Sequence, residues 1–199
     1  MNYTINWDNQ TSLYNWVEQL DLICVDKEHI GLIGSVYFMG WTTTCLVVPP
    51  LADRYGRRLI FLGCLMLLLV SYAWLMFTHN INVTISMMYL QGFITSGRIT
   101  VGYVYMQEFM TPKWRVVIGA TWNVFDGLTY LFMTIYFGWI DKHYFYYCMI
   151  GFWFATFTVC VGLLFIPESP LWLLKVGRID QAKLAIKKIV KFNGFDAAD

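Results

Sequence analysis

The sequence predicts an all-α membrane protein, a bundle of five transmembrane helices followed by an amphipathic cytoplasmic helix. Hydrophobic residues make up 58% of the 199 positions and charged residues only 14%, whereas a soluble domain carries about 25% charged residues. A soluble fold of this length could not bury so much apolar surface. Aromatic residues reach 19%, which suits a protein that anchors rings at two membrane–water interfaces.

Five stretches are long enough to cross a hydrocarbon core of about 30 Å, which takes about 20 apolar helical residues. They are residues 29–50, 59–77, 84–106, 116–140 and 144–166. Only the polar residues 141–143 separate the last two, as in a helical hairpin at a membrane surface. The chain is thereby divided into an outer loop segment (1–28), a transmembrane bundle (29–166) and a cytoplasmic segment (167–199).

The cytoplasmic segment contains an amphipathic helix over residues 179–192. Apolar residues recur on one helical face, with lysines opposite, and Asn193-Gly194 is a helix stop. The predicted apolar face consists of Ile179, Ala182, Ile186 and Ile189. We expect this helix to lie under the bundle or on anionic lipid.

The distribution of Lys and Arg predicts the orientation. Eleven of the 14 basic residues fall on one side of the predicted spans, and the positive-inside rule places that side in the cytoplasm. They are Arg54, Arg57, Arg58, Lys113, Arg115, Lys175, Arg178, Lys183, Lys187, Lys188 and Lys191. Glycosylation sequons at Asn2, Asn9 and Asn82 all fall on the outer side. Five spans put the N-terminus outside, so we expect an earlier helix to be missing and the chain to be a fragment.

The loop between the first two predicted spans reads LADRYGRR, residues 51–58. Asp53, Arg54, Gly56, Arg57 and Arg58 combine an acid, a turn glycine and three cations in one short connection. A loop that only fixes topology needs the arginines but not Asp53, Gly56 or the spacing. The pattern resembles the loop 2–3 signature of the major facilitator superfamily, usually written G-x-L-a-D-r-x-G-r-r. The resemblance implies a gate, in which the Asp locks one half of a transporter onto the other. The leading glycine of that signature is Pro49 here.

Two further stretches resemble elements of sugar and organic ion porters. Residues 107–115 (QEFMTPKWR) resemble E-x-x-P-x-K-x-R with one extra residue, and residues 167–174 (PESPLWLL) resemble PESPRWLL, with Leu171 in place of Arg. Helix capping and a proline-terminated span are the alternative explanation. The resemblance implies a cytoplasmic charge network of Arg57, Arg58, Glu108, Arg115 and Glu168.

The segment 16–41 resembles the E-W-D-L-V-C sequence that leads into helix two of the organic cation and anion transporters. Among the transporter subfamilies, the organic cation and anion transporters are our first choice for this sequence, and the sugar porters are the second. The resemblance implies that the chain holds helices two to six of a 12-helix protein. The first helix and the second six-helix half would then be partners outside this sequence. It also implies that Cys24 pairs with a cysteine upstream of Met1.

Two charged residues fall inside predicted spans, where a charge is costly and is normally paired or faces water. Arg98 lies 10 residues before Glu108, and Asp126 lies 11 residues after Arg115, so both are about 15 Å deep. One interpretation is an ion pair that joins two neighbouring helices. The other is that Arg98 binds an anionic group of a substrate, or that Asp126 takes a proton or a cation. Both stay open.

These features predict a secondary active transporter that moves a small organic ion or related solute by alternating access. The alternative is a non-transporting subunit or binding protein derived from a transporter.

We expect a multi-pass protein of the plasma membrane, with an organelle membrane as the alternative. No nucleophile–base pair, phosphate loop or metal-ligand cluster is evident, so we predict no enzymatic activity, cofactor or metal. The basic residues follow topology and form no nucleic-acid patch.

Overall fold

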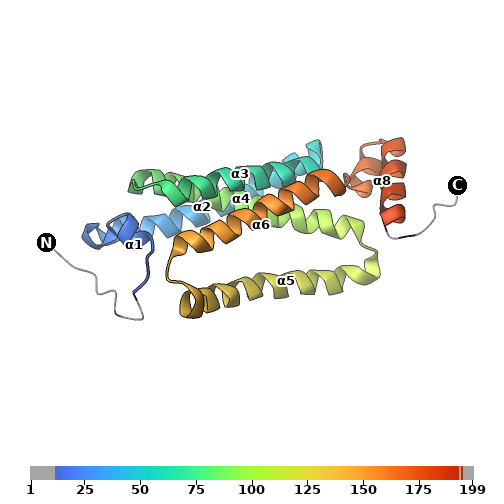
Figure 1. Cartoon of the computed structure of the whole chain (residues 1–199). Helices are drawn as coiled ribbons and strands as arrows, with labels where there is room; N and C mark the ends of the chain where they lie inside the picture. Colours follow the sequence, from blue (N-terminus) through green and yellow to red (C-terminus); the bar gives the residue numbers. More distant parts are fainter. Residues whose placement is uncertain (1–11, 193, 195–199) are drawn as a thin grey trace.

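The protein is a bundle of long helices that run along one axis (Figure 1). The computed structural model describes residues 12–192 and residue 194. Its helices are α1 (Trp16–Gln19), η1 (Leu22–Cys24), α2 (Lys27–Tyr55), α3 (Arg57–Phe77), α4 (Ile81–Phe109), α5 (Pro112–Ile135), the π-helical turn η2 (Tyr136–Ile140), α6 (Tyr144–Phe165), α7 (Pro170–Lys175) and α8 (Ile179–Phe192). The described part contains no β-strand beyond one isolated bridge between Tyr14 and His143.

Four helices are long and apolar enough to cross a membrane, counting only the described residues: α2, α3, the continuous α5–η2 helix and α6. They contain four of the five predicted spans. The remaining span, 84–106, lies in α4, which is as long as α2 at 29 residues but is not apolar enough over its length to be one of these four. The reason is that α4 is the most enclosed helix, with ten buried residues that include Thr84, Gln91 and Ser96. Side chains that face protein need not be apolar to be accommodated in a membrane.

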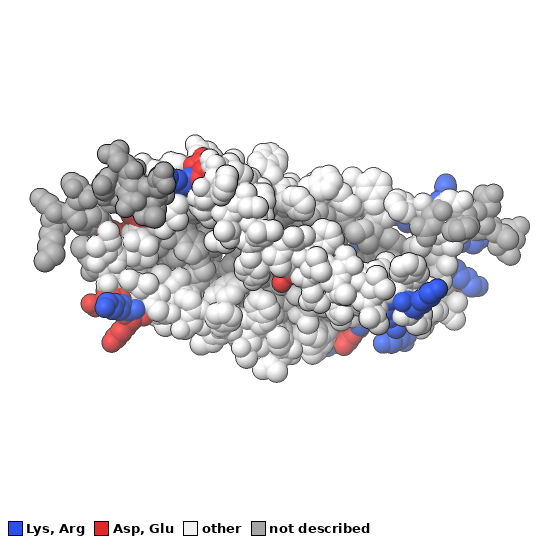
Figure 2. Space-filling model, turned by 90° about the horizontal axis from the view of Figure 1, so that it is seen from below, with Lys and Arg blue, Asp and Glu red and all other residues white. Residues whose placement is uncertain are grey.

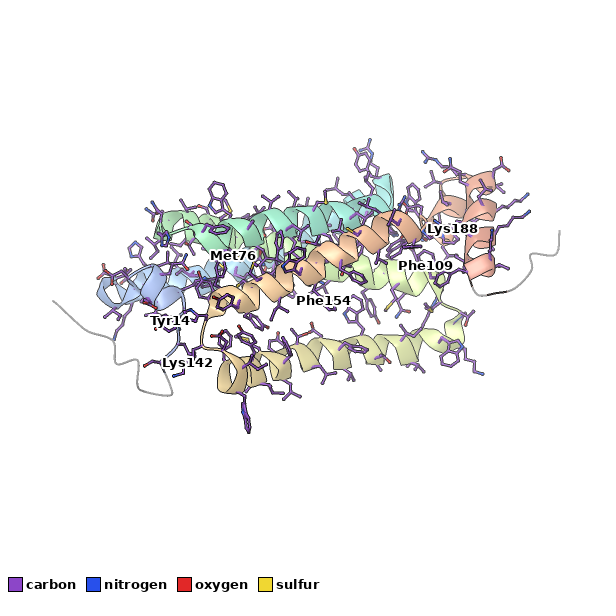
Figure 3. All side chains as sticks on the ribbon, viewed as in Figure 1. Tyr14, Met76, Phe109, Lys142, Phe154 and Lys188 are labelled. Atoms are coloured by element: carbon purple, nitrogen blue, oxygen red, sulfur yellow. The ribbon has the colours of Figure 1, made fainter. Side chains whose placement is uncertain are left out.

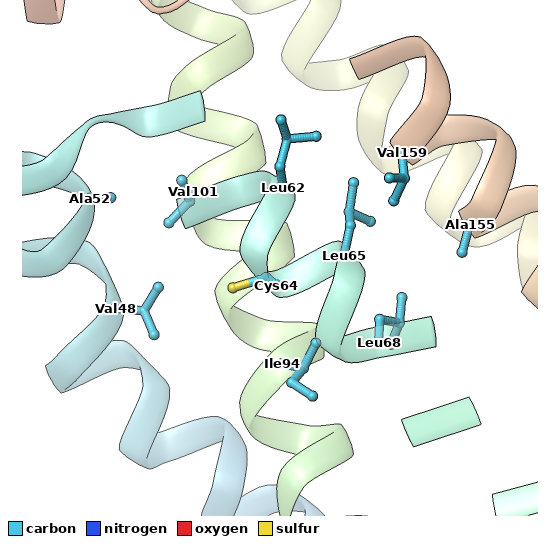
Figure 4. Packing of buried hydrophobic residues seen from close by; sticks show 10 residues of the cluster. All are labelled: Val48, Ala52, Leu62, Cys64, Leu65, Leu68, Ile94, Val101, Ala155 and Val159. Atoms are coloured by element: carbon cyan, nitrogen blue, oxygen red, sulfur yellow. The ribbon is translucent and has the colours of Figure 1, made fainter. Parts of the chain in front are cut away.

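The core lies where α2, α3, α4 and α6 meet. Figure 4 shows its ten residues, which come from all four helices. They are Val48, Ala52, Leu62, Cys64, Leu65, Leu68, Ile94, Val101, Ala155 and Val159. Ile94 is fully buried at the centre of this cluster.

The α2–α4 contact depends on reciprocal glycines. A Cβ atom at Gly92 would overlap the carbonyl oxygen of Tyr37, and one at Gly40 would overlap that of Tyr89. Thr44, which is fully buried, donates a hydrogen bond across the same contact to the carbonyl of Phe93 at 2.6 Å. Close backbone approach at small residues is the way in which transmembrane helices associate without a hydrophobic driving force.

Helix α5 stands apart from the other long helices over most of its length (Figure 1). Gly119 is its single buried residue. Near the middle of α5, the rings of Tyr103 and Trp122 lie 6.3 Å apart, and toward its C-terminal end Phe132 stacks on Tyr147 at 6.2 Å. Helix α5 therefore leaves most of its surface uncovered by the described part of the chain.

The N-terminal segment contacts two helix junctions at one end of the bundle. Tyr14 exchanges backbone hydrogen bonds with Lys142 and Tyr144, and its ring stacks on His143 at 4.0 Å. The Gln19 side chain donates to the carbonyl of Thr78 at 2.6 Å. Tyr14 and Lys142 are labelled at this end in Figure 3, far from Lys188. The sequons at Asn2 and Asn9, and the side chain of Cys24, lie outside the described residues.

The opposite end carries the α2–α3 and α4–α5 junctions together with α7 and α8, and we call it the basic end. Helix α8 runs across the axis of the long helices there (Figure 1). Its buried residues are Ala182 and Ala185, whereas Ile179 and Ile186 are 55% and 44% exposed. The small Ala182 and Ala185 allow α8 to approach Trp172 and Leu173 of α7, while Ile179 and Ile186 of the predicted apolar face stay exposed.

Candidate functional site

Three charged side chains from α2, α3 and α4 meet at the basic end. An Arg57 nitrogen lies 2.5 Å from an Asp53 carboxylate oxygen, and Arg57 Nε donates to Glu108 Oε1 at 3.3 Å. The Arg57 and Glu108 side chains are only 6% and 11% exposed, whereas that of Asp53 is 67% exposed. Glu108 Oε2 is buried without a hydrogen-bond partner. The cluster therefore consists of a buried arginine with one buried and one exposed carboxylate.

The predicted connecting loop is a single residue. Helix α2 continues through Pro49 and Pro50 to Tyr55, and α3 starts at Arg57, so the LADRYGRR stretch is helical except at Gly56. Gly56 has φ +110°, a conformation that L side chains rarely adopt. Its position also has no room for a side chain, because a Cβ there would lie 2.5 Å from Glu168 Oε2. Gly56 therefore permits both the sharp bend and the approach of Glu168.

Glu168 joins the site through backbone groups. Its Oε1 accepts from the N–H groups of Arg58, at 2.9 Å, and Ser169, at 3.0 Å. The Arg58 guanidinium does not bind Glu168 but donates a hydrogen bond to the carbonyl of Leu163 at 2.7 Å. Glu168 thus binds the N-terminal backbone of α3, where a negative charge is favoured.

Arg54 and Arg115 take no part in the cluster. The Arg54 guanidinium lies 5.6 Å from the ring centre of its neighbour Tyr55. Arg115 Nε donates to the carbonyl of Met110 at 3.3 Å and so caps the end of α4. The structure therefore brings together Asp53, Arg57 and Glu108, attaches Arg58 and Glu168 through the backbone, and leaves these two arginines at the periphery.

Three residues of this region were missed by sequence reasoning. Trp172 Nε1 donates to the carbonyl of Asp53 at 2.7 Å, and the Tyr105 hydroxyl donates to the carbonyl of Pro167. Ser169, fully buried, accepts from the Trp172 N–H at 3.2 Å as the N-cap of α7. The Ser-Pro pair at 169–170 is a recognisable N-cap signature. The other two contacts have no sequence signal, because both partners are carbonyls brought near by the fold.

Arg98 and Asp126 are not paired. Neither forms an ion pair within 4.0 Å in the described part of the chain. Arg98 is half-buried, and its Nε is buried without a hydrogen-bond partner, whereas Asp126 is exposed on α5. The ion pair assumed that α4 and α5 pack along their whole length, but they meet only near the basic end. No group of three potential metal-ligating side chains occurs among the described residues.

Charge is concentrated at the two ends of the molecule. Figure 2 shows Lys, Arg, Asp and Glu gathered at the two ends, with lysines and arginines prevailing at the α8 end, and a middle that is almost free of charge. This distribution fits a molecule whose middle lies in hydrocarbon.

Comparison with known proteins decides the family. The profile of the family described as "Sugar (and other) transporter" matches residues 2–198. The chain belongs to this transporter family. The resemblance to major facilitator transporters drawn from the motifs is thereby confirmed. The chain is an integral, multi-pass membrane protein.

Individual relatives show which members of the family the chain is similar to. The chain is 26% identical over 196 residues to Organic cation transporter 1 of Caenorhabditis elegans, covering 98% of this chain and 33% of the relative. It is 27% identical to Solute carrier family 22 member 2 of Rattus norvegicus, covering 94% of this chain and 34% of the relative. It is 29% identical to Organic cation/carnitine transporter 2 of the same species, covering 91% of this chain and 32% of the relative. The chain therefore spans about a third of the length of these relatives.

Proposed function

We propose that this chain forms part of a secondary active transporter, a larger protein of 12 helices that moves a small organic ion by alternating access. Transport by rocking requires two bundles around a central site, and the described helices supply one. The remaining helices would be the first helix and a second six-helix half.

The Asp53–Arg57–Glu108 cluster is the observation that carries this proposal. Arg57 and Glu108 are buried and fix the position of the cluster, while the Asp53 carboxylate is two-thirds exposed. An exposed carboxylate on a rigid base can bind a partner bundle and release it, at little cost in the stability of its own bundle. This arrangement supports the role of a cytoplasmic gate.

Arg98 and Asp126 are the candidates for the solute or ion site. Along their helices, Arg98 lies about 16 Å and Asp126 about 21 Å from the helix ends at the basic end. Arg98 has a buried Nε that no described group satisfies, and a buried donor without a partner costs about 1–3 kcal/mol. A solute anion, or a carboxylate from another helix, would satisfy it. Asp126 on the largely uncovered α5 could accept a cation or a proton.

The relatives' names suggest the solute class. Proteins named for organic cations and for carnitine match nearly the whole chain. Carnitine carries both a quaternary ammonium group and a carboxylate, so an arginine and an aspartate at similar depth suit it chemically. We propose an organic cation or a zwitterion of this kind as the solute.

A chimera tests the proposal. Residues 12–192 would replace the matching third of the rat organic cation/carnitine transporter, and uptake of radiolabelled carnitine and of tetraethylammonium would be measured at matched surface expression. We expect uptake above that of cells without transporter. A chimera that reaches the surface and binds neither solute would contradict the proposal.

Single substitutions in that chimera separate the roles. Asp53→Asn should lower uptake at least tenfold without changing solute affinity, because it weakens the gate. Arg98→Gln and Asp126→Asn should weaken the apparent affinity. Asp180→Asn, which also removes one carboxylate but lies on exposed α8, is the control and should have no effect. Normal transport by the Asp53→Asn variant would show that Asp53 is not part of the gate.

The second candidate, a non-transporting subunit or binding protein, is favoured by one observation. Most of α5 is exposed, and it could be covered by helices of another membrane protein. Stable co-purification of the chain with such a protein, together with a chimera that binds but does not transport, would favour this candidate.

A further inference from the structure

A groove of about 430 Å³ lies at the basic end, between the α2–α3 junction and helices α7 and α8. Three cationic side chains line it: Arg58 from α3, Arg178 from the turn before α8, and Lys188 from α8. Its apolar lining includes Tyr55, Trp172 and Leu184. The groove is separate from the Asp53–Arg57–Glu108 cluster, since none of those three side chains lines it.

The positive charge of the groove is not neutralised by the described side chains. None of the three cations has a carboxylate oxygen within 4.0 Å. Glu168 is the one acidic residue in the lining. Its Oε1 already accepts from two backbone N–H groups at the starts of α3 and α7. The groove therefore keeps an excess of two positive charges.

The two arginines are held in place. Arg58 is anchored by its bond to the Leu163 carbonyl, and its Nε is buried without a hydrogen-bond partner. The Arg178 guanidinium lies 5.9 Å from the Trp172 ring centre, in a cation–π contact. Trp172 is itself buried and bonded to the Asp53 carbonyl. Fixed guanidinium groups are suited to bind phosphate with two parallel hydrogen bonds.

We propose that this groove binds the phosphate-bearing headgroup of an anionic lipid. The groove lies where the long helices end, and α8 runs across their axis (Figure 1), so the groove is at the level of lipid headgroups. The exposed Ile179 and Ile186 on α8 lie beside its lysines, and such a helix binds at the membrane interface. The cytoplasmic leaflet is anionic, and basic pockets on that side bind phosphorylated headgroups.

Binding of this lipid does not depend on transport, so it can be tested on the 199-residue chain alone. The purified chain, in a non-ionic detergent, would be titrated with dioctanoyl phosphatidylinositol 4,5-bisphosphate and analysed by native mass spectrometry. Dioctanoyl phosphatidylcholine is the neutral lipid, and free inositol 1,4,5-trisphosphate is the headgroup without its tails. We expect binding of the anionic lipid at least tenfold tighter than either.

Two double variants separate the groove from general surface charge. R178Q/K188Q removes two cations that line the groove, and K183Q/K187Q removes two from the same helix region that do not. All four side chains are exposed, so both variants should unfold at the same temperature as the parent without lipid. We expect the first to weaken lipid binding at least tenfold and the second less than threefold.

Four results would overturn the proposal. Equal losses in both double variants would mean that surface charge alone attracts the lipid. Free inositol trisphosphate that binds as tightly as the lipid would identify a soluble phosphate as the ligand. Absence of binding to the parent chain, or equal affinity for an acidic peptide such as polyglutamate, would show that the groove does not recognise lipid phosphate.

Discussion

Arg57 is the most deeply buried charged residue of the charge cluster at the basic end. With 6% of its side chain exposed, it contacts one carboxylate from the end of α2 and one from α4. Removing one partner of a buried pair leaves an uncompensated charge, which costs more than the pair itself contributes. The stability of the basic end should therefore depend on Arg57 more than on any exposed arginine nearby.

We predict that Arg57→Met lowers the free energy of unfolding by about 3 kcal/mol, because Glu108 is left buried without its cation. Unfolding by SDS titration in mixed micelles, followed by tryptophan fluorescence, would measure the change. Arg54→Met, which removes an arginine without a carboxylate partner, is the matched control and should change it by less than about 0.5 kcal/mol. The double variant R57M/E108M should be more stable than R57M. An R57M protein as stable as the parent would contradict this account.

The sequence predicted part of this cluster at the residue level. The motif resemblance identified Asp53 as a gate residue and Arg57 and Glu108 as members of a charge network, and the structure places the three in contact. The same resemblance included Arg115, which instead caps α4. Arg115 follows the α4–α5 bend, and its side-chain direction depends on where that bend places the start of α5. No residue pattern specifies that direction.

At the scale of the elements, the α2–α4 contact holds the bundle together. Gly40 and Gly92 each face the backbone of the other helix, and Thr44 bonds across the contact. In a membrane, such van der Waals and hydrogen-bond contacts take the place of hydrophobic burial as the force between helices. The space between these two helices leaves no room for even one methyl group.

Gly92→Ala should therefore lower the free energy of unfolding by about 2–3 kcal/mol, the usual cost of overpacking. The same SDS titration would measure it. Gly34→Ala on α2 is the control, because a Cβ there meets nothing within 4 Å, and it should leave stability within about 1 kcal/mol of the parent. Equal effects of the two changes would refute close packing at Gly92.

Helix α7 depends on its N-cap. Ser169→Ala removes the acceptor for the Trp172 N–H and should cost about 1 kcal/mol. Hydrogen exchange measured by mass spectrometry should show faster exchange in Pro170–Lys175 and unchanged exchange in α3. Ser86→Ala, which removes an exposed hydroxyl that bonds only to a carbonyl of its own helix, is the control. Unchanged exchange in α7 of the Ser169 variant would argue against this role for the cap.

At the scale of the whole molecule, the two ends are chemically different. One end holds the Tyr14 and Gln19 contacts with two helix junctions, and the other holds the charge cluster, α7 and α8. The positive-inside rule assigns the second end to the cytoplasm. The groove, the charge cluster and α8 should then all face the same compartment.

Cysteine labelling in cells would test this orientation. In a variant that lacks the five native cysteines, His79→Cys should react with a membrane-impermeant maleimide on intact cells. Lys183→Cys should react only after permeabilisation, because α8 lies at the other end. Both positions are exposed, so access to the reagent is the one difference between them. The reverse pattern would invert the topology.

The sequence by itself determined the class of fold, the approximate spans, the amphipathic helix and the family. The first three follow from local composition and periodicity, because the bilayer requires each crossing segment to be apolar and helical on its own. The family followed from the resemblance of short motifs such as LADRYGRR. The exception among the spans was the low hydropathy of α4, which is tolerated because neighbouring helices cover it.

Only the tertiary structure decided which of the predicted residues meet. It placed Asp53, Arg57 and Glu108 in one cluster, left Arg98 and Asp126 unpaired, and turned Ala185 rather than Ile186 of α8 toward the protein. Such outcomes depend on how far apart two helices lie and how each is rotated about its axis. Backbone contacts such as those at Gly40 and Gly92 set these quantities, and they involve carbonyl groups that every residue carries.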